Sequence, residues 1–316
     1  MEYSTFRQCV YDEVKNSLSE DFDVSLSENI KNNSVSRWAI NIKAKGKKVA
    51  PSIYLEGFYE KYNTCICDIK TIATDIVECY LEHKDDIDFD VDKFRDFSKI
   101  QKSIRCKLIN REENYALLKN IPYIEFLDLV LVFYCIFNET DTYTQSCVVT
   151  NNHIALWNIK VEDLKKIALL NTRKYSCFNI TAMNKIIAEL FKQQLFEGEL
   201  YENGEILKYI NDETEENNMY VLTNKQKIFG AVAIVYDQIL EDFANIINSD
   251  LYIIPSSVHE VIIIPYTKSE DISIYNQIIE EVNMNNVSKE ERLSGHLYLY
   301  ERGTGQVTIP TEYISQ

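Results

Sequence analysis

The hydrophobic pattern of this chain changes its period several times, and each change restricts the elements that can form there. Apolar residues recur every three or four positions, as in helices, at 6–18, 66–80, 161–168, 183–191, 237–248 and 275–282. Between these stretches, short segments alternate or run apolar between polar turns, as strands do. They lie at 21–30, 37–45, 47–55, 121–137, 145–151, 219–224, 228–236, 251–255, 259–265 and 296–301. Strands that pair with their sequence neighbours, with helices between the groups, predict an α+β fold with mostly antiparallel sheets and helices packed on them.

The order of these elements suggests how the chain is divided. A helical region with a small sheet is expected at 1–120, with Lys45 and Gly46 at one hairpin tip and a helix that runs from Phe94 to Leu108. A β-hairpin with helices follows at 121–210, and an α+β region at 219–316, which can form one unit with 121–210. The polar segment "NDETEENN" at 211–218 is the best candidate for a boundary.

The charge balance makes some partners poor candidates. The chain of 316 residues holds 49 acidic and 33 basic residues, so its formal net charge is −16. Such a chain repels phosphate backbones and anionic membranes, and direct nucleic-acid binding is not expected. The densest basic group is Lys43, Lys45, Lys47 and Lys48, which is typical of exposed lysines at a hairpin tip.

Composition also predicts the compartment. The opening residues "MEYSTFRQCVYDEV" carry charges where a secretion signal has an apolar core. The longest strongly apolar run, "FLDLVLVFYCIF", is shorter than the ~20 residues that span a bilayer, and it contains Asp128. Eight cysteines without a secretion signal indicate a reducing environment. We therefore expect a cytoplasmic protein with no membrane segment.

Glycine is scarce, with 8 residues in the chain, and the two common phosphate-binding loops, G-x-G-x-x-G and G-x-x-x-x-G-K-[ST], are both missing. Cys65, Cys67, Cys79 and His83 are unevenly spaced for zinc, because paired cysteine ligands usually lie two to four residues apart. The acidic stretch that begins at Asp86 lacks the glycine and the glutamate of a calcium loop. No cofactor and no metal are predicted.

The stretch "YIIPSSVHEVIIIP" at 252–265 is the main candidate for a site, because Ser257, His259 and Glu260 lie close together in it. Along a strand, His259 and Glu260 point to opposite faces, which disfavours a catalytic triad, and no G-x-S-x-G elbow is present. Pro255, Ser256 and Ser257 are good turn formers, and a hairpin turn between two strands is the favoured interpretation of this stretch. Asn224 and Lys225, which follow another strand, could form an anion or peptide site together with this turn.

Several segments carry a resemblance to known families: "VAPSIYL", "FLDLVLVFY", "YVLTNKQKIFGA", "LYIIPSSVHEVIIIP" and "LYLYER". In this order they resemble a family of uncharacterised cytosolic proteins from anaerobic Firmicutes, which is known only as a domain of unknown function. The segment "NYALLKNIPYIEFLDLVLVF" is distantly similar to the YtpQ-like uncharacterised proteins. The resemblance implies one continuous family unit and an accessory or anti-defence role near mobile elements. Neither family brings an activity, so no catalytic residue is carried over.

The sequence therefore predicts a soluble, non-catalytic protein that acts by binding a protein partner through Asn224, Lys225, Ser257, His259 and Glu260. One alternative is a small hydrolase or transferase that uses Ser257, His259 and Glu260. Another is an acidic inhibitor, of the anti-defence type, of a nucleic-acid enzyme, which requires carboxylates in rows on one surface. The sequence does not indicate the oligomeric state.

Overall fold

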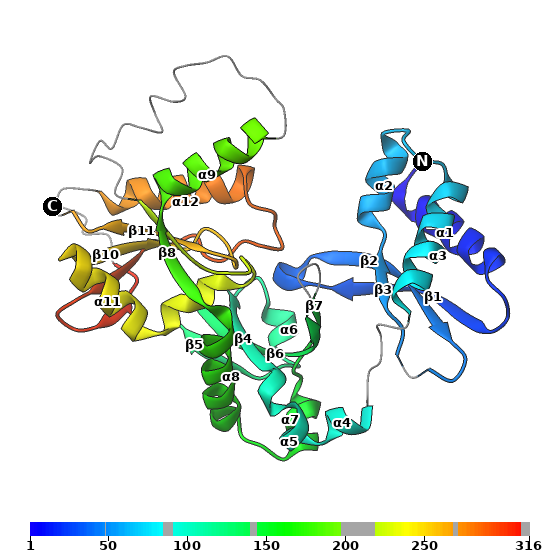
Figure 1. Ribbon diagram of the computed structural model, residues 1–316, viewed down its shortest axis with the longest axis horizontal. Coiled ribbons are helices and arrows are strands. Elements are labelled where there is room, and N and C mark those ends of the chain that lie inside the picture. The colour runs from blue at the N-terminus through cyan, green and yellow to red at the C-terminus, as the bar shows by residue number, and fades with distance from the viewer. Residues whose placement is uncertain (48, 85–90, 140–143, 197–218, 268–270, 311–316) are drawn as a thin grey trace. The chain divides into compact units, whose positions relative to one another are not determined.

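The computed structural model (Figure 1) describes residues 1–316 except for 48, 85–90, 140–143, 197–218, 268–270 and 311–316. Contacts divide the chain into two compact units, Met1–Ile100 and Gln101–Gln316. All strand pairs in the described residues are antiparallel, and the fold is α+β. The candidate boundary at 211–218 lies outside the described residues. Among the helices that the structure describes, none has the length and apolar character to cross a membrane.

The first unit is a three-stranded sheet, in the order β1-β2-β3, with helices packed on one face (Figure 1). Its elements are α1 (Tyr3–Ser17), β1 (Phe22–Ile30), η1 (Asn32–Ser34), β2 (Ser36–Ala44), β3 (Ser52–Tyr54), α2 (Glu56–Asn63), α3 (Ile69–His83), α4 (Val91–Arg95) and α5 (Phe97–Ile100). Phe6 and Val10 of α1 pack with Ile40 and Ile42 of β2 and Ile76 of α3 in one buried cluster. The predicted hairpin tip is confirmed, because Gly46 lies in the turn after β2 with a left-handed φ of +86°.

The second unit contains two further sheets. The four-stranded sheet has the order β4-β6-β5, with β7 also paired to β6, and the six-stranded sheet has the order β13-β12-β10-β11-β9-β8. The first half of the unit runs through η2 (Gln101–Ser103), β4 (Ile104–Asn110), α6 (Tyr115–Leu118), β5 (Tyr123–Phe126), β6 (Leu129–Glu139), β7 (Thr144–Val148), α7 (Asn151–Trp157) and α8 (Val161–Ser176). The second half comprises β8 (Phe178–Ala182), α9 (Met183–Phe196), β9 (Tyr220–Asn224), η3 (Gly230–Val235), α11 (Asp237–Ile247), β10 (Leu251–Ile254), β11 (Val261–Pro265), α12 (Ile272–Asn285), β12 (Tyr298–Glu301) and β13 (Gln306–Thr308).

Two predicted pairings are confirmed by the register. β10 and β11 form the expected hairpin, with Ile253 opposite Ile263. The segment at 145–151 pairs with the strand before it, with Cys147 opposite Cys135. The long apolar segment at 121–137 is two strands rather than one, because the chain turns at Leu127, where φ is +56°.

Two element predictions are wrong. In place of the helix expected from Phe94 to Leu108 there are two short helices, α4 and α5, and Ile104 and Leu108 belong to β4. Residues four apart share a face in a helix and also in a strand, so their spacing did not distinguish the two. The strand expected at 228–236 is instead the 3₁₀ helix η3, whose first five residues are buried.

Gly230, the first residue of η3, packs closely against neighbouring segments. A Cβ atom at this position would lie 2.5 Å from the His259 carbonyl oxygen and 2.5 Å from Thr223 Oγ1. Only glycine allows the backbone to approach the 255–260 turn this closely. The start of η3 is therefore held against that turn.

Candidate functional site

The structure brings the loop after β9 and the turn between β10 and β11 together. Thr223 Oγ1 donates a hydrogen bond to the His259 carbonyl oxygen at 2.8 Å, and the Ala231 N–H donates to the Val258 carbonyl oxygen at 3.4 Å. The Phe229 N–H donates to His259 Nδ1 at 3.2 Å. Two segments that are thirty residues apart in the sequence thus form one continuous surface.

Asn224 closes the loop by binding its far end. Its side chain is buried, donates from Nδ2 to the Ile228 carbonyl oxygen at 2.7 Å and accepts the Ile228 N–H at 3.1 Å. Lys227 and Phe229 adopt left-handed φ angles of +53° and +55°. Lys225 and Lys227 are exposed to solvent. Asn224 therefore shapes the loop, and the lysines form its outer side.

The His259 ring lies flat against Phe229 and is 29% exposed as a side chain. The ring centroids are 5.7 Å apart with an interplanar angle of 11°. Because Nδ1 accepts the Phe229 N–H, the neutral ring carries its proton on Nε2. Nε2 lies 3.6 Å from Glu291 Oε1, so the carboxylate beside this histidine is Glu291.

Phe229 also contacts the four-stranded sheet. The Lys107 ammonium lies 4.0 Å from the centroid of the Phe229 ring, a cation–π contact. Tyr134 meets the same ring edge-on, with the centroids 5.6 Å apart. We call Lys107, Lys225, Lys227, Ile228, Phe229 and His259 the Phe229 surface. It combines three lysines with a partly buried aromatic ring.

Ser257 and Glu260 stabilise the turn itself. The Ser257 hydroxyl oxygen accepts the His259 backbone N–H at 3.1 Å, and the Ser257 N–H donates to the Glu260 carbonyl oxygen at 3.3 Å. Within the described residues, no hydrogen bond joins the Ser257 hydroxyl to the His259 ring. Ser257, His259 and Glu260 lie in one turn, and these contacts of Ser257 and Glu260 are those of turn formation.

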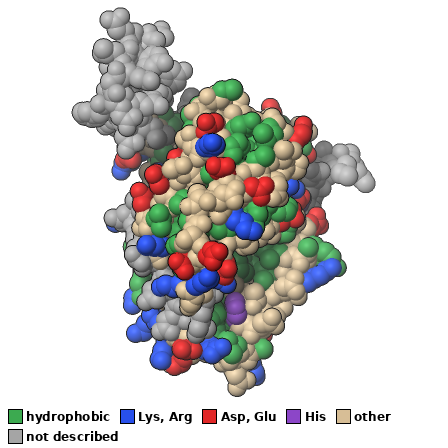
Figure 2. Space-filling view, turned by 90° about the vertical axis from the view of Figure 1, so that its right-hand side faces the viewer, with side chains coloured by type: hydrophobic (Ala, Val, Ile, Leu, Met, Phe, Trp, Pro, Cys, Tyr) green, Lys and Arg blue, Asp and Glu red, His purple; other side chains and the backbone are tan. Residues whose placement is uncertain are grey.

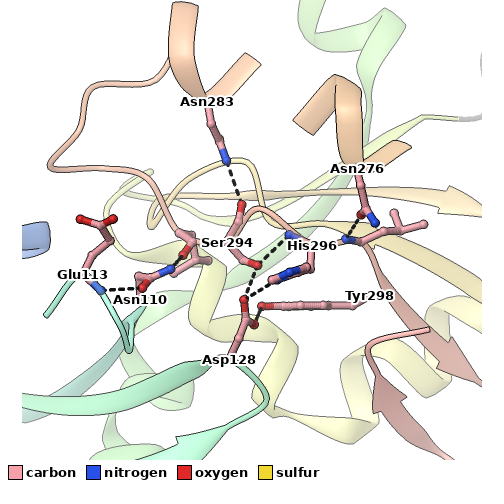
Figure 3. Close-up of polar contacts among 10 residues, drawn as sticks. Asn110, Glu113, Asp128, Asn276, Asn283, Ser294, His296 and Tyr298 are labelled. Atoms are coloured by element: carbon pink, nitrogen blue, oxygen red, sulfur yellow. Dashed lines mark hydrogen bonds and ion pairs between the residues drawn. The ribbon is translucent and has the colours of Figure 1, made fainter. Parts of the chain in front are cut away.

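A second polar cluster surrounds Asp128, at the tight turn between β5 and β6 (Figure 3). Asp128 Oδ2 accepts the Ser294 hydroxyl at 2.6 Å and lies 3.0 Å from His296 Nδ1, while Oδ1 accepts the Tyr298 hydroxyl. One carboxylate thus contacts three side chains from the segment that leads into β12. The His296 side chain is 56% exposed, whereas Ser294 and Tyr298 are buried.

Asparagine side chains hold the same segment in place (Figure 3). Asn283 of α12 donates to the Ser294 carbonyl oxygen at 2.9 Å, and Asn110 of β4 donates to the Leu293 carbonyl oxygen at 2.9 Å. Asn276 Oδ1 accepts the Leu297 N–H at 2.9 Å. Burial, followed by the charge of Asp128, raises the pKa of Tyr298 well above its ordinary value. The hydroxyl is therefore a stable donor to the carboxylate, and the cluster acts as an anchor for residues 293–298.

The Asp128 cluster is not indicated by any pattern in the sequence. Asp128 lies more than 160 residues before Ser294, His296 and Tyr298, and in the sequence it is only a charge inside an apolar run. In the ranges that the structure describes, no group of three or more His, Cys, Asp or Glu side chains is placed to hold a metal ion. His83 Nδ1 instead lies 2.9 Å from the carbonyl oxygen of Cys79, one turn earlier in α3.

The described residues thus form an α+β fold with three antiparallel sheets, and one surface combines lysines with an aromatic ring. The sequence profile of DUF5688, a family of unknown function, matches residues 3–302, and the chain belongs to this family. No curated protein and no solved structure matches the chain.

Proposed function

We propose that this protein is non-catalytic and acts by binding a protein partner on the Phe229 surface. The observation that supports this is the ordered position of Phe229, whose ring is stacked on His259 and contacted by the Lys107 ammonium. Aromatic side chains fixed in this way are typical centres of protein interfaces, because little entropy is lost when a partner covers them.

The charges of the Phe229 surface indicate the chemistry of the partner. The Lys107 ammonium lies over the ring, and Lys225 and Lys227 are exposed in the loop that leads to it, in a chain whose net charge is −16. Ile228, which is 45% exposed, adds an apolar contact beside them. We infer that the partner presents an acidic segment with an apolar side chain next to it.

Charge reversal at the loop tests this proposal. The variant Lys225→Glu with Lys227→Glu is compared with Lys166→Glu and Lys185→Glu, two exposed lysines on α8 and α9 that carry the same charge change. Each protein is used as bait in a lysate of the source cells, and captured proteins are quantified by mass spectrometry. We expect one partner that wild type and the control retain and the loop variant loses. Equal capture by all three proteins would contradict the proposal.

The other hypotheses receive less support. A hydrolase or transferase based on Ser257, His259 and Glu260 requires the serine hydroxyl to meet the imidazole, and this hydroxyl instead accepts the His259 backbone N–H. An acidic inhibitor of a nucleic-acid enzyme requires rows of carboxylates. On the face shown in Figure 2, acidic and basic side chains are interspersed.

The cellular location and the source of the protein are part of the same proposal. A cytoplasmic location agrees with eight cysteines that are all free thiols. We also propose that the protein belongs among those of anaerobic Firmicutes and is distantly similar to YtpQ-like proteins. An accessory role near mobile elements would suit a protein that acts by binding a partner.

A further inference from the structure

The first unit contains a cavity of about 230 Å³ between the end of the β1–β2 pair and the last turn of α3. Its apolar lining consists of Phe22, Ala44, Val49, Pro51 and Tyr80. Phe22 and Ala44 are opposite each other in the strand register, so they close one end of the sheet. The cavity lies within one unit and shares no residue with the Phe229 surface.

The apolar wall is fixed in place. Tyr80 is 5% exposed, and its ring meets Phe22 edge-on with the centroids 5.8 Å apart. An apolar cavity of ~150 Å³ is large enough to bind benzene. A volume of about 230 Å³ therefore admits one aromatic ring together with a short polar group.

Two lysines complete the lining, and they come from different elements. Lys47 follows the hairpin tip and Lys84 follows α3, and both are exposed. Lys43, two residues before the tip, lies 3.7 Å from the carboxylate of Asp23. In the described part of the chain, neither Lys47 nor Lys84 has a carboxylate within ion-pair distance. Both ammonium groups thus lie where an anion can approach the mouth of the cavity.

We propose that this cavity binds a small apolar carboxylate. The ring or chain of the ligand lies against Phe22 and Tyr80, and its carboxylate is bound by Lys47 and Lys84. The carbonyl groups at the C-terminal end of α3 carry a partial negative charge, so the anion depends on the two ammonium groups. A neutral molecule of the same shape gains only the apolar contacts.

The test uses 3-phenylpropanoate and its uncharged analogue 3-phenylpropanol as probes, titrated into the full-length ¹⁵N-labelled protein. Amide shifts are followed by TROSY spectra in wild type, in Lys47→Gln with Lys84→Gln, and in Lys15→Gln with Lys70→Gln. The last pair is the control, because both lysines are exposed in the same unit and neither lines the cavity.

We expect 3-phenylpropanoate to shift the amides of Phe22, Ala44 and Val49 in wild type and in the control. The cavity variant should bind it roughly three- to tenfold more weakly, as expected for two partly exposed ion pairs. 3-Phenylpropanol should bind wild type and the cavity variant equally. The proposal is overturned if these amides do not shift at millimolar 3-phenylpropanoate, or if the cavity variant binds it as tightly as wild type.

Discussion

At the scale of single residues, Asp128 shows how a partly buried charge is accommodated. Its side chain contacts the Ser294 and Tyr298 hydroxyls and the His296 ring, and its own carbonyl oxygen accepts the Arg111 N–H at 3.2 Å. A partly buried carboxylate without such partners would be strongly destabilising. Asp128 therefore belongs to the stability of the second unit, and Tyr298 is the member whose titration can be followed.

Replacing Tyr298 by phenylalanine should change how stability depends on pH. The pKa of Tyr298 is raised well above 10.0, first by burial and then by the charge of Asp128. Above this ordinary value the unfolded chain loses the phenol proton while the folded chain keeps it, so the free energy of unfolding falls as pH rises. Tyr298→Phe removes this contribution, which amounts to about 1.4 kcal/mol per pH unit.

Urea unfolding from neutral pH to about pH 11 measures the difference between the two proteins. Near neutral pH the variant should be less stable by about 1.5–3 kcal/mol, because a hydrogen bond to a charged group is lost. This difference in the free energy of unfolding should narrow above the ordinary tyrosine pKa.

Other groups with raised pKa values, such as Cys106 at about 12, change the stability of both proteins alike. Parallel curves over the whole range would show that Tyr298 does not titrate as inferred. Tyr115→Phe, which removes an exposed hydroxyl, is the matched control.

At the scale of elements, local pattern was sufficient where two strands are adjacent in sequence. The β10–β11 hairpin follows from two apolar runs around Pro255 and Ser256, whose turn chemistry is local. At 228–236 the predicted strand is wrong, because a continuous apolar run fits a strand and a buried 3₁₀ helix equally. The close packing of Gly230 against His259 depends on a segment about thirty residues later, which local pattern does not show. The contact between His259 and Glu291 could not be predicted from the sequence either, because it depends on how distant segments pack.

The edge of β4 shows an element stabilised by side chains of a helix. β4 pairs only with β6 among the described strands, and α8 packs beside it. The Cys106 N–H donates to Thr172 Oγ1 at 3.0 Å, and Asn171 Nδ2 donates to the Gln101 and Ile104 carbonyl oxygens at 2.7 and 3.0 Å. The helix thus satisfies backbone groups that a further strand would otherwise bind.

Thr172→Val should destabilise the protein by about 1–3 kcal/mol, because valine keeps the shape of threonine but leaves the buried Cys106 N–H without an acceptor. Thr172→Ser keeps the hydroxyl and should lose less, about 1 kcal/mol for one buried methyl group. Chemical denaturation of both variants beside wild type provides the measurement. If valine is tolerated as well as threonine, or if serine costs as much as valine, the hydroxyl does not have this role.

At the scale of the whole molecule, the chain consists of two units with separate cores. Contacts place the division between Ile100 and Gln101, whereas the sequence suggested a first region that extends to residue 120. The difference arises from β4, which pairs with β6 and so belongs with the later chain. Pairing between strands that are separated by another element cannot be read from the local hydrophobic period.

Because the core of the first unit is drawn entirely from its own elements, residues 1–100 should fold when expressed alone. The fully or largely buried members of this core are Phe6, Val10, Val14, Ile40, Ile42, Leu55, Ile72, Ala73, Ile76 and Tyr80. α3 supplies the last four of them, so a fragment of residues 1–68 keeps the sheet but loses one side of the core. We expect the 1–100 fragment to show dispersed amide signals and a cooperative thermal transition by circular dichroism, and the 1–68 fragment to show neither. An unfolded 1–100 fragment would mean that the first unit depends on the second for its stability, and a folded 1–68 fragment would mean that α3 is not needed to complete the core.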